Sequence, residues 1–306
     1  MNKMKTNDNA NIYYYEHQPI KKDKEKGILI IIPGWAYIAD TWSPVLETNE
    51  YLKQYYHVFI IITRGYNNEY YNYGNTMDRY SMDIYEFFKY KNLTKNISLL
   101  GHSIGGALIW RMISLFGEQM FKNYIIVDEP PVLLKNKINM SISDINTQKG
   151  MVYTPKMLEK TFKILHGPKA RKQIIKYARY YFTTKFQKEH PEIVDRVLNG
   201  TLKFNNNVLV DILIDVANMN NITLILQSQM ITKPTLLIGG EQSMLNDETI
   251  VSQGKYYKHP TIYIFEEDGS SHSMFIEKYM EFNKVLNKFL QQKTIGNKTR
   301  RIRSDL

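Results

Sequence analysis

The sequence predicts an α/β protein built on a mostly parallel sheet, and three observations support this prediction. Short runs rich in Ile, Leu and Val alternate with longer segments of helical period, which is the pattern of strands joined by crossover helices. The run Gly-Ile-Leu-Ile-Ile-Ile-Pro-Gly over 27–34 is apolar almost throughout, as in a strand that is buried on both faces. The alternation stops near residue 132 and resumes near residue 232.

Each element is placed by its own residues. The strands are short apolar runs, several of them closed by Pro-Gly, Arg-Gly or an acidic residue, and we expect them at 27–34, 57–65, 97–101, 123–128, 234–240 and 261–267. The helices carry apolar residues at three- and four-residue spacing, most clearly in 76–91. We expect helices at 40–56, 76–91, 104–117 and 274–292.

The middle of the chain, 132–231, lacks convincing central strands. It contains helical stretches rich in Lys, Tyr and Gln, two of which open with a proline, a residue that is tolerated at the first helical position. We interpret it as a helical cap inserted into one α/β core formed by 1–131 and 232–293. The remaining residues, 294–306, form a basic tail that we predict to be disordered.

The composition excludes several classes of function. The 306 residues carry a formal net charge of +10 but no cysteine, which excludes disulfides, thiolate zinc sites and cysteine nucleophiles. The lysines are scattered and no nucleic-acid-binding module accompanies them, so no nucleic-acid partner is predicted. Metal-ligand spacings and dinucleotide fingerprints are missing, so we expect no metal and no cofactor.

Two features of the sequence bear on where the protein is located. No apolar run in the sequence reaches the length of about 18 residues that spans a bilayer, and the N-terminus has no apolar signal region. We therefore expect a cytoplasmic protein without a membrane span. The sequence does not indicate an oligomeric state.

One motif points to chemistry. Gly101-His102-Ser103-Ile104-Gly105 follows an expected strand and precedes an expected helix, which is the context of a Gly-x-Ser-x-Gly nucleophile elbow. The serine must occupy a strained corner with its hydroxyl exposed, and side chains on the neighbouring residues would clash there. Ser103 is therefore a candidate nucleophile, and the helix that follows favours negative charge at its N-terminus.

Two further features fall where acyl transfer would need them. Pro33-Gly34-Trp35 follows the first buried strand, so the amides of Trp35 and Ile104 are candidate donors to an oxyanion. His272 lies on the loop after the last expected strand and is the candidate base, because a serine needs an adjacent base to become nucleophilic. His102 belongs to the elbow, and we assign it to packing.

These residues carry a resemblance to a known family. The segments PGWAYIADTW, TRG, GHSIGG, EPPVLLK and GSSHSMFIEKYMEFNKVLNKFL resemble the α/β-hydrolase superfamily, and more narrowly its cofactor-free haloperoxidase (perhydrolase) and aryl-esterase branch. The resemblance implies an eight-stranded, mostly parallel sheet, a helical cap over the site and acyl transfer from a small ester through an acyl-serine. It also implies Ser103 as the nucleophile, His272 as the base, and Trp35 and Ile104 as the oxyanion-hole donors.

The acid of this arrangement departs from the family pattern. The family usually places an Asp three residues after the glycine that ends the penultimate strand, and that position is Ser243 here. Asp128 closes the strand 123–128 and is the leading replacement. Glu241 and Asp247 are alternatives, and Glu129 or no acid at all complete the possibilities.

The substrate is predicted from the expected walls of the pocket. Met274 and Phe275 follow the histidine, and with Trp35 and Ile104 they predict an apolar pocket for a small acyl or aryl ester. The leading hypothesis is a serine hydrolase of carboxylic esters. An acyltransferase or perhydrolase that uses the same acyl-serine is one alternative, and a non-catalytic ligand-binding protein on a hydrolase scaffold is the other.

Overall fold

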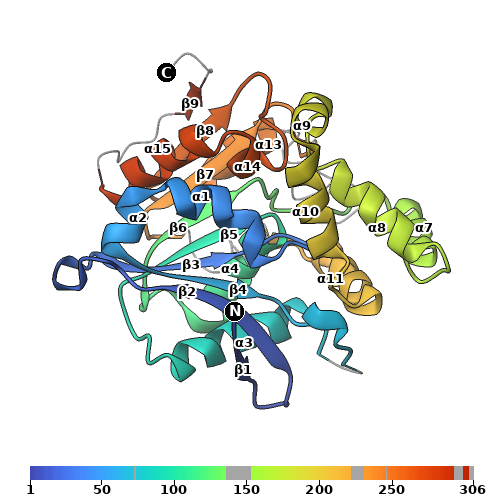
Figure 1. The fold of residues 1–306 in the computed structure, drawn as a ribbon, viewed down its shortest axis with the longest axis horizontal. Helices are drawn as coiled ribbons and strands as arrows, with labels where there is room; N and C mark the ends of the chain where they lie inside the picture. The colour runs from blue at the N-terminus through green and yellow to red at the C-terminus, as the bar shows by residue number, and fades with distance from the viewer. Residues whose placement is uncertain (72–73, 136–152, 222–230, 246, 293–298, 303–306) are drawn as a thin grey trace.

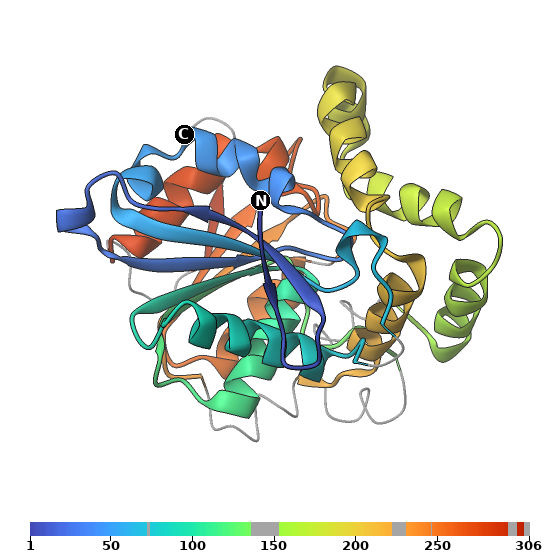
Figure 2. The same cartoon turned by 60° about the horizontal axis from the view of Figure 1, so that its bottom comes forward.

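The computed structural model describes residues 1–71, 74–135, 153–221, 231–245, 247–292 and 299–302. One twisted sheet runs through the molecule and carries helices on both faces (Figure 1). Figure 2 shows α3 and α4 on one face and α1, α2 and α15 on the other. The α/β class and the mostly parallel sheet predicted from the sequence are thereby confirmed.

The sheet has the strand order β1-β2-β4-β3-β5-β6-β7-β8-β9. The pairs β1–β2 and β2–β4 are antiparallel, and every other neighbouring pair is parallel. Ile- and Leu-rich strands occupy its centre because both of their faces are buried under helices. The strands are β1 (Asn2–Lys5), β2 (Asn11–His17), β3 (Gly27–Ile32), β4 (Tyr56–Ile62), β5 (Ile97–His102), β6 (Phe121–Val127), β7 (Thr235–Gly240), β8 (Pro260–Phe265) and β9 (Thr299–Ile302).

The strand count corrects the expectation of eight strands, because the described part of the chain has nine. β9 lies within 294–306, so the prediction of a disordered tail is wrong for residues 299–302; the rest of the tail lies outside the described residues. The two arginines of β9 bind side chains outside this strand. Arg301 forms ion pairs with Asp247 and Glu266, each at 3.2 Å, and Arg300 donates a hydrogen bond to the hydroxyl of Tyr263. The antiparallel strands β1 and β2 were not predicted.

The helices that flank the sheet are shorter than the sequence predicts. The expected helix 40–56 is divided because the side chain of Asn49 accepts from the amide of Leu52 and begins a new helix. The expected helix 274–292 is divided at Lys278. These helices are α1 (Ser43–Thr48), α2 (Glu50–Tyr55), α3 (Met77–Tyr90), α4 (Ile104–Phe116), α13 (Asp247–Ser252), α14 (Met274–Glu277) and α15 (Tyr279–Leu290), and the 3-10 turns are η1 (Lys22–Lys24), η2 (Ala39–Trp42), η3 (Tyr66–Asn68) and η4 (Gln253–Tyr256).

Between β6 and β7 the described residues form five helices and no strand of the sheet. These helices lie together at one end of the sheet, on the right in Figure 1. The segments 136–152 and 222–230 of the predicted cap lie outside the described residues, and the division into core and cap stays a prediction. The helices are α7 (Pro155–Leu165), α8 (Ala170–Arg179), α9 (Thr184–Glu189), α10 (Pro191–Thr201) and α11 (Asn206–Asn218).

A buried ion pair joins the end of β4 to α3. The guanidinium of Arg64 donates to both carboxylate oxygens of Asp83, at 2.9 and 2.6 Å, and also to Asp8. Arg64 is 1% exposed and Asp83 is 2% exposed. The pair satisfies two charges that would otherwise be buried alone, and it attaches α3 and the loop after β1 to the sheet.

Replacing Asp83 by alanine is expected to lower the free energy of unfolding by about 3–5 kcal/mol, because it leaves the Arg64 charge buried without its main partner. The loss is measured by urea unfolding followed by circular dichroism. Glu159→Ala is the matched control, since the Glu159–Lys163 pair on α7 is solvent-exposed and should change stability by less than about 1 kcal/mol. Equal effects of the two substitutions would contradict the structural role of the buried pair.

Candidate active site

Ser103 occupies the corner between β5 and α4. Its backbone has φ 52° and ψ −128°, a conformation that L-residues rarely adopt. Glycine is required on both sides: a Cβ on Gly101 would lie 2.3 Å from the carbonyl oxygen of Gly105, and one on Gly105 would lie 2.2 Å from that of Ile32. The strand and helix therefore meet at a distance that only glycine permits, and this contact holds the serine in its strained conformation.

The corner is held by backbone hydrogen bonds. The amide of Ser103 donates to the carbonyl of Val127 at 2.8 Å, and the carbonyl of Ser103 accepts from Gly106 at 2.6 Å. Ile104 is the first residue of α4, where backbone amides have no carbonyl partner within the helix. The N-terminus of α4 therefore presents free donor capacity and a favourable dipole for negative charge beside Ser103.

His272 and Asp128 form a buried pair. Nδ1 of His272 lies 2.6 Å from Oδ2 of Asp128, and the two side chains are 3% and 0% exposed. Asp128 directly follows β6, and His272 lies on the loop between β8 and α14. Because a carboxylate oxygen only accepts, this contact makes Nδ1 the protonated ring nitrogen and leaves Nε2 free to accept a proton.

Ser243, the residue at the position where the family resemblance places the acid, also contacts Asp128. Its hydroxyl donates to Oδ2 of Asp128, and its oxygen accepts from the amide of Leu245 at 3.0 Å. The side chain at 243 thus supports a carboxylate that enters from the neighbouring strand, β6. The imidazole receives its carboxylate partner from one strand away.

Two of the other candidate acids, Glu241 and Asp247, lie elsewhere. Glu241 accepts from the backbone amide of Glu267 at 3.0 Å, and Asp247 pairs with Arg301 at the start of α13. Neither has a hydrogen bond to His272 among the contacts of the described residues. Of the carboxylates considered from the sequence, the structure brings Asp128 to the histidine.

Burial governs the electrostatics of the pair. Loss of solvent lowers the pKa of His272 to about 3, which keeps the imidazole neutral and able to accept a proton. Burial also raises the pKa of Asp128, and hydrogen bonds from Ser243 and the backbone of Gly240 oppose that rise. Both pKa shifts have the same cause, because burial away from water disfavours the charged form of each group.

His102 packs behind the pair, as expected. It is fully buried, its ring stacks on Tyr37 with centroids 5.4 Å apart, and its Nε2 lies 2.9 Å from the backbone carbonyl of His272. Burial and the nearby His272 lower the pKa of His102, so its ring is neutral and donates from Nε2. His102 therefore helps to hold the loop that carries His272.

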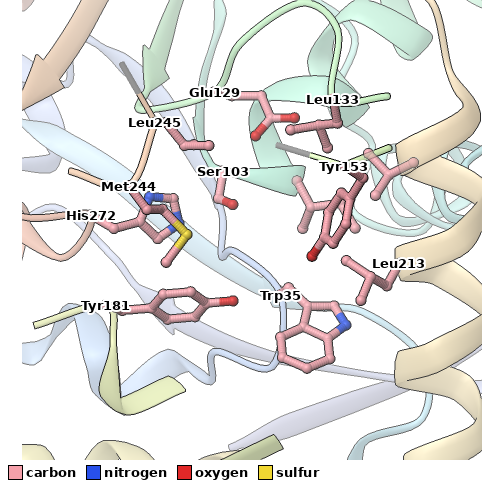
Figure 3. A pocket seen from close by; sticks show the side chains of 12 residues that line it. Trp35, Ser103, Glu129, Leu133, Tyr153, Tyr181, Leu213, Met244, Leu245 and His272 are labelled. Carbon is pink, nitrogen blue, oxygen red and sulfur yellow. The ribbon is translucent and has the colours of Figure 1, made fainter. Parts of the chain in front are cut away.

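A small cavity opens beside Ser103 and His272 (Figure 3). It offers about 60 Å³ of space, whereas one water molecule needs roughly 10–15 Å³. Its wall is mostly apolar and aromatic, so it accommodates a group of only a few non-hydrogen atoms. The lining residues are Trp35, Ser103, Ile104, Glu129, Leu133, Tyr153, Tyr181, Leu213, Val216, Met244, Leu245 and His272.

Trp35 and Ile104, the candidate oxyanion donors, both line this cavity with Ser103. The indole Nε1 of Trp35 donates to the carbonyl of Leu209 at 2.7 Å, so α11 fixes the ring. Trp35 follows the end of β3, which neighbours β5 in the sheet. Residues 35 and 104 therefore reach the cavity from adjacent strand ends.

The prediction of Met274 and Phe275 as pocket walls is wrong for this cavity. Both side chains are 0% exposed and neither lines it. Phe275 stacks on Trp42 with centroids 4.1 Å apart. The short helix α14 places these side chains in the core, where the ring of Phe275 also packs against His102 with centroids 4.7 Å apart.

Sequence reasoning missed most of the wall opposite the serine. Tyr153, Tyr181 and Leu213 come from the segment between β6 and β7, and Met244 comes from the loop after β7. No local motif marks these residues, because their position depends on how that segment folds back over the strand ends. Among the described residues, no cluster of three or more His, Asp and Glu side chains is arranged to hold a metal ion.

No helix among the described residues is both long and apolar enough to cross a membrane. No family model matches the sequence, and no curated protein is significantly similar to it. Comparison of the three-dimensional structure with solved structures, in contrast, finds many matches.

Three of the matching structures cover almost the whole chain. A bromoperoxidase from Bacillus anthracis aligns with a TM-score of 0.78 and 16% identity over 92% of this chain and 96% of its own. An esterase from Exiguobacterium antarcticum aligns with a TM-score of 0.78 and 18% identity over 94% of this chain and 98% of its own. An enol-lactonase from Burkholderia xenovorans aligns with a TM-score of 0.76 and 12% identity over 95% of this chain and 100% of its own. This chain therefore has the α/β-hydrolase fold that these structures share.

Proposed function

We propose that this protein is a serine hydrolase that cleaves a small carboxylic ester through an acyl-serine intermediate. The observation that carries the proposal is the hydrogen-bonded pair of His272 and Asp128 at one wall of the cavity that also exposes Ser103. A serine at an elbow, a neutral imidazole and a carboxylate on its far nitrogen are the parts that nucleophilic acyl transfer requires.

The proposed reaction gives each of these groups one role. Oγ of Ser103 attacks the ester carbonyl while Nε2 of His272 takes its proton, and Asp128 stabilises the imidazolium that forms. The oxygen of the tetrahedral intermediate is held by the backbone amides of Trp35 and Ile104. Nε2 then gives its proton to the departing alcohol. His272 then takes a proton from water, which attacks the acyl-serine, and gives that proton back to Oγ of Ser103. This step releases the acid and restores the serine.

The walls of the cavity support a small substrate. About 60 Å³ beside the serine holds a short acyl group or a small alcohol portion, and the aliphatic and aromatic lining favours groups with few polar atoms. The structural matches to esterases are consistent with ester chemistry, although at 12–18% identity they show the fold alone. The proposal therefore depends on the geometry of the site in this chain.

A fluorophosphonate probe and a series of nitrophenyl esters test this proposal. We expect one probe per chain, and we expect turnover to be highest for acetate to butyrate esters and to fall for longer chains that exceed the cavity. Fast transfer of the acyl group to added alcohol or hydrogen peroxide with slow hydrolysis would indicate the acyltransferase or perhydrolase instead. Absence of both labelling and turnover would indicate a ligand-binding protein.

A further inference from the structure

Glu129 is a buried carboxyl group that the proposed reaction does not use. The residue is 1% exposed, and its Oε1 has no hydrogen-bond partner in the described structure. Buried polar atoms are almost always hydrogen-bonded, because removing one from water without a partner costs free energy. A buried carboxyl oxygen without a partner, next to the proposed reaction centre, therefore indicates a group that is completed by a ligand.

The side chain points into the cavity of the proposed reaction. Glu129 lines the cavity together with Ser103 and His272, and Figure 3 shows its carboxyl group between Ser103 and Leu133. Its backbone is fixed, because its carbonyl accepts from Nε2 of Gln253 at 3.1 Å. Its Cβ packs against α4, where a Cβ on Gly106 would lie only 3.1 Å away. The carboxyl is thus presented to the cavity by rigid neighbours.

The other walls of this space suit a positive charge. The aromatic rings of Trp35, Tyr153 and Tyr181 line it, and none of the lining residues that the structure describes is Lys or Arg. Aromatic faces attract cations through their quadrupole, most strongly where solvent is excluded. Asp128, the residue before Glu129, adds a second acidic group nearby. The carboxyl group of Glu129 and the three aromatic rings in the wall favour a cation over a neutral or anionic group, and Asp128 lies behind the wall rather than in it.

We propose that Glu129 and the rings of Trp35, Tyr153 and Tyr181 form a subsite for a small cationic amine carried by the ester substrate. The inference rests on the proposed ester hydrolase function and names the substrate class of the same cavity. The ester carries its amine within a few bonds of the scissile carbonyl, because the cavity offers only about 60 Å³.

Binding of the amine changes the protonation of Glu129. In the empty site, burial and the neighbouring Asp128 raise the pKa of Glu129, which favours the neutral carboxyl over an isolated buried charge. When an ammonium group enters, the carboxyl releases its proton to solvent and forms an ion pair with the ligand. The positive charge of the amine replaces that of the proton, so the net charge of the subsite does not change.

Matched pairs of esters test the subsite. The phenyl esters of glycine and β-alanine place an ammonium group where phenyl propionate and butyrate carry a methyl group. On the alcohol side, 2-(dimethylammonio)ethyl acetate is paired with 3-methylbutyl acetate. We expect kcat/KM to favour the cationic member in at least one series by about 30-fold or more, the typical value of a close buried charge pair.

Glu129→Gln separates charge from shape, because the amide keeps the size and hydrogen-bonding capacity of the side chain. The ratio of cationic to neutral ester turnover is expected to fall by about 30-fold in this variant. Glu192→Gln on α10 is the matched control, since Glu192 is exposed and lies outside the cavity lining. Its ratio of cationic to neutral ester turnover should equal that of the native protein. No preference for the cationic esters in either series, or a preference that survives in Glu129→Gln, would overturn the proposal.

Calorimetric binding keeps the test independent of folding of the variant and of ester turnover. Propylammonium is expected to bind the native protein and 1-propanol is not, and equal binding of the two would overturn the subsite. If the protein takes no fluorophosphonate and cleaves no neutral ester, the proposed hydrolase function fails. The propylammonium measurement then still decides whether the amine subsite exists.

Discussion

Replacing Ser103 by alanine is expected to reduce kcat for a short nitrophenyl ester by about 10⁶-fold, the loss that removal of the nucleophile causes in a serine protease. The change removes the oxygen that attacks the carbonyl, and no cysteine in the chain offers a replacement nucleophile. Steady-state assays with purified native and variant protein measure the loss. Mass spectrometry after fluorophosphonate treatment should show the label on Ser103 of the native protein and none on the variant.

A control is needed because Ser103 lies at a strained corner. Ser273→Ala removes the hydroxyl of another serine, at the start of α14, where it hydrogen-bonds to Tyr37 and does not line the cavity. Its label stoichiometry should equal that of the native protein. Alanine at 103 has to adopt φ near 52°, so unfolding curves of both variants are recorded to separate stability from chemistry. Ester turnover that survives in Ser103→Ala would refute the proposed nucleophile.

Replacing Asp128 by asparagine is expected to lower kcat by about 10⁴-fold, the effect known for the acid of a serine triad. An amide at this position donates to Nδ1 as readily as it accepts, so it permits the tautomer in which Nε2 carries the proton and cannot act as a base. It also removes the charge that stabilises the imidazolium. Labelling by the fluorophosphonate should become correspondingly slower. A time course of labelling measures this rate without an ester substrate.

Glu241→Gln and Asp247→Asn are the matched controls, because each removes one carboxylate that was a candidate acid but contacts other residues. Both should retain turnover within a few-fold of the native value. Ser243→Ala tests the supporting hydroxyl, and it should lower kcat by much less than Asp128→Asn, since it removes one of the hydrogen bonds that the carboxylate accepts. A large loss in Glu241→Gln or Asp247→Asn, with little in Asp128→Asn, would reassign the acid.

Residues close together in the sequence were the ones that sequence reasoning placed well. The elbow is one example: Gly101, Ser103 and Gly105 are within five residues, and the steric need for glycine at both neighbours is local to one strand, one turn and one helix. The central strands are another, because a run such as Ile28–Ile32 has enough apolar side chains to specify burial on both faces.

Elements that depend on distant partners were predicted less well. The strand β9 consists of Thr-Arg-Arg-Ile, which reads as a solvated basic segment until Asp247, Glu266 and Tyr263 are found beside it. The first two strands were missed because β1 has only four mostly polar residues and β2 mixes tyrosines with polar residues, and they pair antiparallel at the edge of the sheet. Met274 and Phe275 follow the histidine in sequence, but the short helix α14 turns them into the core.

The sequence by itself determined the α/β class, the serine corner and the order of serine before histidine, because each depends on short-range sterics or on the periodicity of apolar residues. The tertiary structure alone decided which carboxylate meets His272, since Asp128 lies 144 residues away and reaches it only because β6, β7 and β8 are neighbours in the sheet. It also decided the walls of the cavity. Tyr153 and Tyr181 are unremarkable in the sequence, and Glu129 was considered there only as a possible acid. The three become a candidate subsite only when the chain between β6 and β7 folds back over the strand ends.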